Sequence, residues 1–186
     1  MDTTVKKRLI TREEYYRMGE TGVIQPHEKV ELINGEIFTM SPIGVTHAAV
    51  VDNLVLVMIR KFGDSSIVRS QNPVCIDQWN EPEPDFALLK FRQDSYYEAH
   101  PDPSDVLLII EVSDTSYEFD RTIKLSLYAS SGIPVYWIID LRHNRIEVYE
   151  DPQSDGYQNQ SLYVSGDRIS FQGHSFEVNE MLLIKQ

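Results

Sequence analysis

Three residues that are far apart in the chain have the types and surroundings needed for phosphate chemistry. Pro84-Asp85 opens one apolar run, Glu111 lies near the end of the next, and Lys124 follows on a helical stretch. A carboxylate at the end of a buried strand is costly unless something pairs with it. Mg²⁺ is a suitable partner, because it binds one or two protein carboxylates and keeps water and substrate phosphate in its other positions. We therefore expect Asp85 and Glu111 to share Mg²⁺ or Mn²⁺, with the Val112 carbonyl as a third ligand.

Taken one at a time, the same residues have ordinary structural explanations. Asp85 could cap a turn after a proline, and Glu111 could bond to backbone at a strand end. Asp120 and Lys124, which are neighbours on one helix face, could form a surface ion pair worth about 0.3–0.5 kcal/mol. Tyr128 continues the same stripe, however. The arrangement as a whole favours a shared ion for Asp85 and Glu111, whereas for Asp120 and Lys124 spacing alone favours the ion pair and a row of side chains that faces a site is the alternative.

The first part of the chain predicts a helix, a hairpin and a long helix. Thr11 and Glu14 form a capping box, so a short helix should begin there. Asn34-Gly35 is a strong hairpin signal because both residues tolerate positive φ, which predicts paired strands over residues 29–33 and 36–40. Apolar residues are nearly continuous over 45–62, before Gly63, and that length favours a buried helix over a strand.

The rest of the chain predicts the strands that carry the acidic residues. Strands are expected at 67–70, 74–77, 85–91 and 106–112, and the last is apolar on both faces, as in a sheet covered on both sides. A helix over 120–131 and a strand over 135–140 complete a β–α–β unit with a right-handed parallel crossover. A strand over 145–150 should pair with the strand before it, and short alternating pieces follow. The fold class is α/β or α+β, around a mixed sheet.

Several of these residues together resemble a known family. The motifs are Pro84-Asp85, Glu111-Val112-Ser113, Asp120-x-x-x-Lys124-x-x-x-Tyr128 and Gly132-x-Pro134-x-Tyr136-Trp137. In this order they are similar to the Uma2 family, formerly DUF820, within the PD-(D/E)xK nuclease superfamily. The likeness includes Glu31 to Glu36, Met40-Ser41-Pro42 and His47, so it covers about residues 10–150. It implies a restriction-endonuclease-like αβββαβ core in a single domain of residues 1–186, with an extra hairpin and a small β extension over about 151–186.

The resemblance also implies roles for individual residues. Asp85, Glu111 and Lys124 would be catalytic, and a glutamate at the position of Glu31 would lie near the metal. The superfamily motif has a lysine where this chain has Ser113. A serine cannot supply the cation that offsets charge on the phosphorus centre. Superfamily members whose lysine has moved to the following helix imply that Lys124 replaces it, because a lysine stem is long and flexible.

Three further residues are expected to contact the substrate: His47, Asp120 and Tyr128. His47 could position a phosphate or water, or could simply lie in the first turn of the long helix. Tyr136 and Trp137 lie in an apolar strand, where aromatic residues are more often core than base-stacking platforms, so we assign them no function.

Composition limits the classes of protein that remain. The chain has 186 residues, 41% hydrophobic and 25% charged, which is typical of one folded domain. Its net charge of −12 argues against a general nucleic-acid coat, and residues 81–120 hold 11 acids against 2 bases. The single Cys75 excludes an internal disulfide and a thiolate metal cage. We find neither a membrane-spanning run nor a secretion signal, so we expect a cytoplasmic protein with no membrane partner.

These observations predict a metal-dependent endonuclease that hydrolyses DNA phosphodiester bonds. A homodimer would allow both strands to be cut and would double a thin set of phosphate contacts. The bases expected to make those contacts are Arg60, Lys61, Arg69, Lys90 and Arg92. Two alternatives stay open. Ser113 favours a nuclease-like fold that has lost catalysis and serves as a binding or regulatory module. The scarcity of basic residues favours a metal-dependent phosphoesterase that acts on small nucleotides.

Overall fold

A six-stranded mixed sheet organises the chain in the computed structural model, which describes residues 5–184. The strand order is β3-β4-β5-β6-β7-β8, with β5 and β6 parallel and the other neighbours antiparallel. The strands are β3 (Ser66–Ser70), β4 (Phe86–Lys90), β5 (Val106–Ser113), β6 (Val135–Asp140), β7 (Arg145–Pro152) and β8 (Tyr157–Tyr163). The mixed sheet and its parallel β5–β6 pair confirm the predicted fold class.

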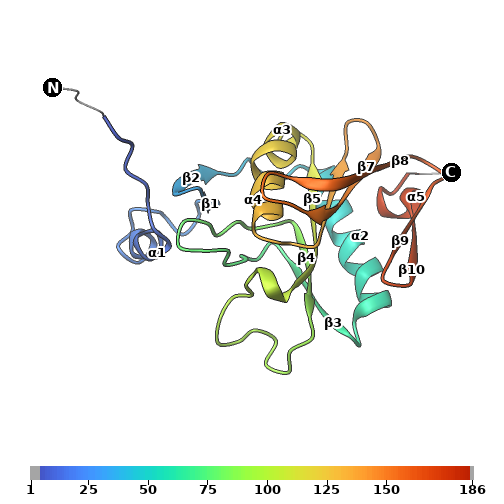
Figure 1. Cartoon of the computed structure of the whole chain (residues 1–186), viewed down its shortest axis with the longest axis horizontal. Helices are drawn as coiled ribbons and strands as arrows, with labels where there is room; N and C mark the ends of the chain where they lie inside the picture. The colour runs from blue at the N-terminus through green and yellow to red at the C-terminus, as the bar shows by residue number, and fades with distance from the viewer. Residues whose placement is uncertain (1–4, 185–186) are drawn as a thin grey trace.

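Helices cover both faces of this sheet. On one face, α2 (Val45–Phe62) packs through Leu54 and Met58 against a core that includes Ile110 and Trp137. The next residues along the strands, such as Ile109 and Tyr136, turn to the other face, where they pack against Tyr128 of α4 (Leu125–Ser130). Figure 1 shows α2 and α4 on opposite sides of the central strands. Strand β5 is therefore buried on both faces, as its unbroken apolar sequence predicts.

The helical segment after β5 differs from the regular helix predicted over residues 120–131. It begins earlier, at α3 (Tyr117–Phe119), and continues through a π-helical turn, η2 (Asp120–Lys124), into α4. In the π turn the Leu125 N–H donates to the Asp120 carbonyl, five residues back. That carbonyl also accepts a hydrogen bond of 3.1 Å from the Tyr136 hydroxyl. The wide turn is thus held from the neighbouring strand, a tertiary contact that helical periodicity cannot reveal.

The N-terminal elements form as predicted. The capping box of Thr11 and Glu14 begins α1 (Arg12–Glu20). Strands β1 (Val30–Ile33) and β2 (Glu36–Thr39) form the hairpin, and Asn34 (φ 52°) and Gly35 (φ 70°) both adopt the left-handed conformation that its tight turn requires. In Figure 1, α1 and this hairpin lie together at one end of the molecule, away from the hairpin of β9 (Arg168–Phe171) and β10 (His174–Glu177) and from α5 (Val178–Met181).

Residues 74–77 do not form the predicted strand. The Val74 N–H donates to the Pro82 carbonyl and the Ile76 N–H to the Asn80 carbonyl, so the segment folds back on its own loop. A short helical turn, η1 (Pro103–Asp105), precedes β5. Within residues 5–184 no helix is both long and apolar enough to cross a membrane.

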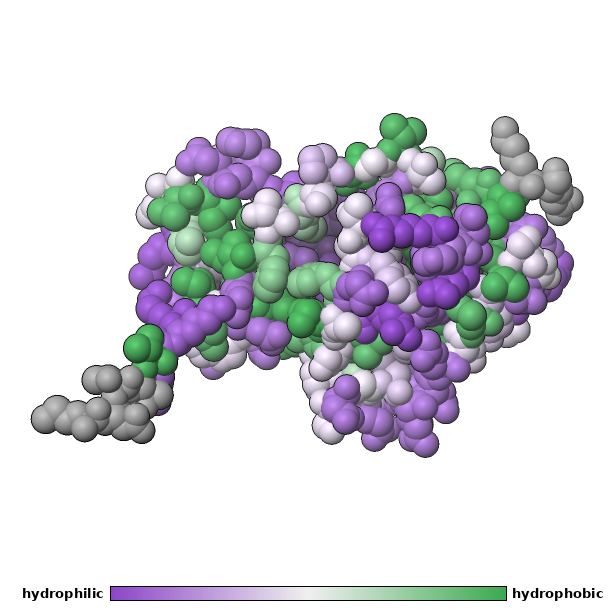
Figure 2. All heavy atoms as spheres, turned by 90° about the horizontal axis from the view of Figure 1, so that it is seen from above, coloured by the Kyte–Doolittle hydropathy of each residue, from purple (hydrophilic) through white to green (hydrophobic). Residues whose placement is uncertain are grey.

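The residues after 151 contribute to the main fold. Strand β8 is the edge strand of the central sheet, whereas β9 (Arg168–Phe171) and β10 (His174–Glu177) form a separate hairpin that precedes α5 (Val178–Met181). Ile169, Phe176 and Met181 from these elements belong to the core under α2. Figure 2 shows hydrophilic and hydrophobic side chains interspersed over the face that it presents.

Candidate functional site

Asp85 and Glu111 lie together at one end of the sheet. Asp85 immediately precedes β4 and Glu111 lies near the end of the antiparallel neighbour β5, so the two strands bring both residues to the same edge. The Asp85 N–H donates to Glu111 Oε2 at 3.2 Å, and Asp85 Oδ2 accepts from the Val112 N–H at 2.9 Å. The predicted neighbourhood of these two acids is therefore present in the fold.

Lys124 reaches the same point from the π turn. Its Nζ lies 2.9 Å from Glu111 Oε1 and 3.2 Å from Glu31 Oε2 of β1. All three side chains are almost inaccessible, with relative exposures of 3% for Glu31, 2% for Glu111 and 4% for Lys124. Lys124 therefore bridges the hairpin and the central sheet, and Glu31 lies beside the proposed metal ligand Glu111 through their shared contact with Lys124.

The charges in this cluster depend on one another. Burial opposes charge on Lys124, but the carboxylates of Glu111, Glu31 and Asp120 outweigh it, so the pKa of Lys124 lies well above its ordinary value. Burial also raises the pKa of Glu111 well above its ordinary value, and the Lys124 ammonium offsets this only in part. The surrounding carboxylates thus favour the charged form of Lys124, and its ammonium favours the ionised form of Glu111 against the effect of burial.

Asp120 is held by two serines at the start of the π turn. The hydroxyls of Ser113 and Ser116 both donate to Asp120 Oδ2 at 2.7 Å. Ser113 occupies the position where the superfamily motif has a lysine, and it is fully buried. Here its side chain fixes the helix that carries Lys124, so the position still contributes to the site through a different contact. Within the described chain Lys124 pairs with Glu31 and Glu111, not with Asp120 as a surface ion pair.

His47 touches Asp85 from the first turn of α2. Its Nε2 lies 3.0 Å from Asp85 Oδ2, and Nδ1 is buried without a partner among the described residues. The hydrogen bond to Asp85 raises the pKa of His47, and burial opposes it. Burial likewise opposes ionisation of Asp85, but the contacts with His47 and Val112 prevail and lower the pKa of its carboxyl. His47 thus orients a carboxylate of the site.

These groups line one cavity of about 560 Å³. Six acids and two lysines line it, together with His47. The acids are Glu31, Glu83, Asp85, Glu111, Asp114 and Asp120, and the lysines are Lys29 and Lys124. Apolar side chains form another part of the wall, namely Phe38, Met40, Pro42, Ile43 and Phe119. The cavity is therefore strongly acidic around Lys124 and apolar beside it.

The donor atoms suit a hard divalent cation. Among residues 5–184, no group of three or more His, Cys, Asp or Glu side chains is arranged to hold a metal ion. Mg²⁺ does not require such a group, because it is commonly bound through one or two carboxylates with water in its remaining positions. Within residues 5–184 the hydrogen bonds to the Asp85 carboxylate are made through Oδ2, which leaves Oδ1 for a ligand. The carboxylates of Asp85 and Glu111, at one strand edge and lining one cavity, fit that chemistry.

Two sets of predicted site residues are placed differently from expectation. Tyr128 is fully buried and donates to Glu111 Oε1 at 2.9 Å, so it supports an acid of the site and is not placed to touch a substrate. Arg60 and Lys61 lie in the last turn of α2, roughly 20 Å along the helix axis from His47.

The remaining predicted phosphate contacts are also directed elsewhere. Lys90 ends β4 at the strand terminus opposite Asp85, and Arg92 follows it. Arg92 pairs with Asp94 at 2.6 Å and lies over the Tyr96 ring, as does the guanidinium of Arg69. The direction of α2 and β4 therefore carries Arg60, Lys61, Lys90 and Arg92 away from the acids, and contact of the five bases with flanking phosphates stays a prediction.

The sequence motifs did not identify the aromatic part of the cavity wall. Phe38 of β2 and Phe119 of α3 contact each other, with ring centroids 4.9 Å apart and an angle of 53° between the rings. They come from segments far apart in the chain. The position of Phe119 immediately before Asp120 was the only sequence signal that could have suggested it.

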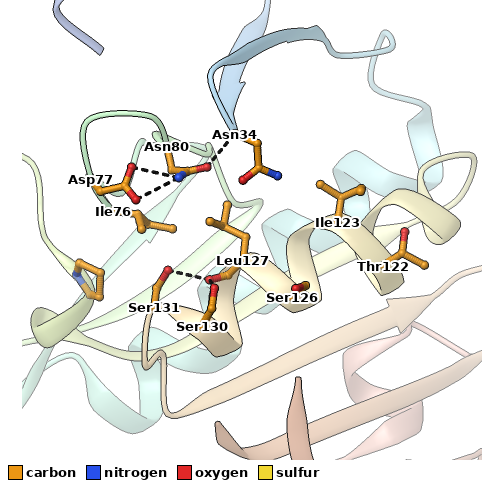
Figure 3. Close-up of a pocket in the computed structure, with 11 residues that line it drawn as sticks. Asn34, Ile76, Asp77, Asn80, Thr122, Ile123, Ser126, Leu127, Ser130 and Ser131 are labelled. Atoms are coloured by element: carbon orange, nitrogen blue, oxygen red, sulfur yellow. Dashed lines mark hydrogen bonds between the residues drawn. The ribbon is translucent and has the colours of Figure 1, made fainter. Parts of the chain in front are cut away.

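A second cavity of about 480 Å³ lies between α4 and the loop before β4. Figure 3 shows Ser130 and Ser131 of the helix end below Asp77 and Asn80 of the loop. Both serine hydroxyls donate to the Leu127 carbonyl, and Asp77 accepts from the Asn80 amide. These polar groups satisfy one another, so the cavity offers no comparable chemistry.

Comparisons with known proteins identify a family and a similar fold. The model of a family named Uma2, described as "Putative restriction endonuclease", matches residues 12–179. The match therefore extends past residue 150, where the motifs end. A crystal structure of a "putative nuclease belonging to DUF820" from Anabaena variabilis has a similar fold, with a TM-score of 0.71 and 14% sequence identity. That similarity covers 94% of this chain and 98% of the other. Among curated proteins, none matches the chain.

Proposed function

The chain belongs to the Uma2 family, and on that premise we propose that it is a nuclease that hydrolyses phosphodiester bonds in DNA with the help of Mg²⁺ or Mn²⁺. The observation that carries the proposal is the convergence of Asp85, Glu111 and Lys124 on one cavity from two strands and a helix. Paired carboxylates can bind a divalent metal ion, and a lysine beside them can stabilise the negative charge that develops on a phosphate.

Each residue has a separate task in this proposal. Asp85 and Glu111 would hold the metal, which when bound supplies Lewis acidity at the phosphate and at a water molecule. Lys124 would stabilise the negative charge that develops on the phosphate oxygens, because it stays protonated and lines the cavity. Glu31 and Glu111 hold the ammonium in place, and His47 holds the Asp85 carboxylate.

Lys124 also answers the main objection to catalysis. Ser113 removes the usual lysine from β5, which favours a nuclease-like fold without activity. The ammonium of Lys124 lies against Glu111 nonetheless, 2.9 Å from its carboxylate. This contact favours an active enzyme over a binding or regulatory module. A homodimer that presents two such sites is part of the proposal and would allow both strands to be cut.

The test is cleavage of supercoiled plasmid and of a labelled single-stranded oligonucleotide, with Mg²⁺, with Mn²⁺ and with chelator. We expect cleavage only with metal, and a loss of roughly 100-fold or more in Asp85→Asn, the order of effect of one charge-stabilising group. Asp64→Asn, an exposed acid just after α2, is the matched control and should cleave normally. Absence of metal-dependent cleavage of both substrates would favour the inactive module, and hydrolysis of small nucleotide diesters alone would favour the phosphoesterase.

A further inference from the structure

We propose that the cavity accepts one unpaired nucleotide of a nucleic acid strand, with its base against Phe38 and Phe119, and does not accept the side of an intact duplex. This proposal rests on the proposed nuclease function and names the form of its substrate. It is carried by the depth of the reactive groups, the aromatic wall and the charge of the lining.

The reactive groups lie too deep for a regular duplex. Glu31, Glu111 and Lys124 are each at most 4% exposed, the Asp85 side chain is 16% exposed, and all four line a cavity of about 560 Å³. Cavities of about 300–1,000 Å³ enclose a single small ligand. A paired strand keeps its bases stacked inside the helix, so it can present only its outer sugar-phosphate edge to such a cavity and no base to the aromatic wall. An unpaired nucleotide can enter with its phosphate and its base together, as in enzymes that extrude their target from the stack.

The aromatic wall gives the base a surface to pack against. Phe38 and Phe119 are half-buried and both line the cavity. Their ring centroids lie 4.9 Å apart, so the two rings form one aromatic surface. Ile43, which is 39% exposed, extends the apolar surface at the start of α2. Aromatic rings beside a phosphate site are the usual way in which proteins bind unpaired bases without reading their sequence.

The charge of the lining disfavours a duplex. Six acids and two lysines line the cavity, and the bases of α2 and β4 lie at the far ends of those elements. Duplex binding depends on several phosphate contacts made by Lys and Arg. Stacking on an aromatic surface provides affinity that does not depend on such contacts. The site is therefore better suited to a nucleotide held by its base and one phosphate than to a long polyanionic surface.

The experiment compares one labelled oligonucleotide, single-stranded and annealed to its complement, with the full chain in Mg²⁺ or Mn²⁺. Binding is measured by fluorescence anisotropy and cleavage by gel. We expect the single strand to bind and be cut at least about tenfold better than the duplex. Phe38→Ala and Phe119→Ala should each weaken single-strand binding by about tenfold, the fold-change of one lost stacking contact. Phe38→Leu keeps an apolar side chain of similar volume, so it should fold normally. Because it removes the aromatic ring, it should lose most of the affinity for the single strand that Phe38→Ala loses.

Two controls separate stacking from general damage. Phe91→Ala removes an aromatic ring that is 60% exposed and outside the cavity lining, and it should bind as the wild type does. A single strand with abasic sites should bind the wild type about tenfold more weakly and be insensitive to Phe38→Ala. Equal or better binding and cleavage of the duplex, or normal single-strand binding by both phenylalanine variants, would overturn the inference while leaving nuclease activity intact. Hydrolysis of mononucleotide diesters without binding to either DNA form would overturn it in favour of a small-molecule substrate.

Discussion

The buried position of Lys124 between two carboxylates predicts a large loss of stability when the lysine is replaced by methionine. Methionine has a similar length, so the substitution removes the charge with little change of volume. In the folded protein Glu31 and Glu111 then remain buried without the ammonium that lies 3.2 and 2.9 Å from their oxygens. Removing one partner of a buried ion pair costs about 3–5 kcal/mol, because it leaves an uncompensated charge. That is a large part of the roughly 5–15 kcal/mol that stabilises an ordinary domain.

Equilibrium unfolding in urea measures this loss, with the fluorescence of the buried Trp137 as a signal of the core. With a slope of about 1–3 kcal/mol per molar urea, we expect the unfolding midpoint of Lys124→Met to fall by about 1–5 M. The double variant Lys124→Met/Glu111→Gln should be more stable than Lys124→Met, because one stranded carboxylate has been removed. The control Lys90→Met changes an exposed lysine at the end of β4 and should alter stability by less than about 0.5 kcal/mol.

The pH dependence provides an independent check of the same reasoning. A stranded buried carboxylate has a pKa above its value in the unfolded chain, so it takes up a proton as the pH falls and its destabilising effect decreases. The difference in free energy of unfolding between wild type and Lys124→Met should therefore decrease as the pH is lowered from 8 to 5. A loss below about 1 kcal/mol at pH 8, or a gap that does not change with pH, would refute the assignment of Lys124 as the compensating cation.

Three further predictions concern Cys75 and Glu147, which do not line the cavity, and Tyr128, which supports Glu111. Burial and the hydrogen bond to Glu81 raise the pKa of Cys75 to about 12. Iodoacetamide should therefore alkylate Cys75 in the folded protein at pH 8 more than about 100-fold more slowly than it alkylates free cysteine, as measured by mass spectrometry. A rate near that of free cysteine would contradict the placement of this thiol. Burial opposes ionisation of Glu147, but hydrogen bonds from Tyr117, Tyr149 and Arg121 prevail and lower its pKa below the ordinary value of 4.5. The ionised carboxylate therefore stabilises the fold fully above pH 4.5, and this stabilisation is lost as the pH falls through the pKa of Glu147 in the folded protein. Glu147→Gln should cost about 1–3 kcal/mol at pH 7 and less at pH 3.5 in urea unfolding, and the exposed control Glu150→Gln should cost little at either pH. Tyr128→Phe leaves the shape of the core unchanged but removes the hydroxyl donor to Glu111, and it should cost about 1.5–3 kcal/mol; a neutral effect in the same assay would mean that this hydrogen bond does not support the acid.

Local sequence was sufficient for the elements that carry their own signals. The Thr11–Glu14 capping box, the Asn34-Gly35 turn and the apolar run of α2 each specify one conformation through neighbouring residues alone. The unbroken apolar sequence of β5 likewise specified a strand covered on both faces. The apolar runs over 85–91 and 106–112 also predicted that Asp85 and Glu111 lie at strand ends.

Only the tertiary structure decided how the site is completed. The π turn that carries Lys124 depends on contacts from Tyr136 and Ser113, which belong to other strands, so helical periodicity alone gave a regular helix in its place. Strand direction carried Lys90 away from the acids, although it lies close to Asp85 in the chain. Phe38 and Phe119 meet only because the hairpin packs against α3. The residue types that do the chemistry can be recognised one by one along the chain, whereas their distances, burial and shared charge are set by long-range packing.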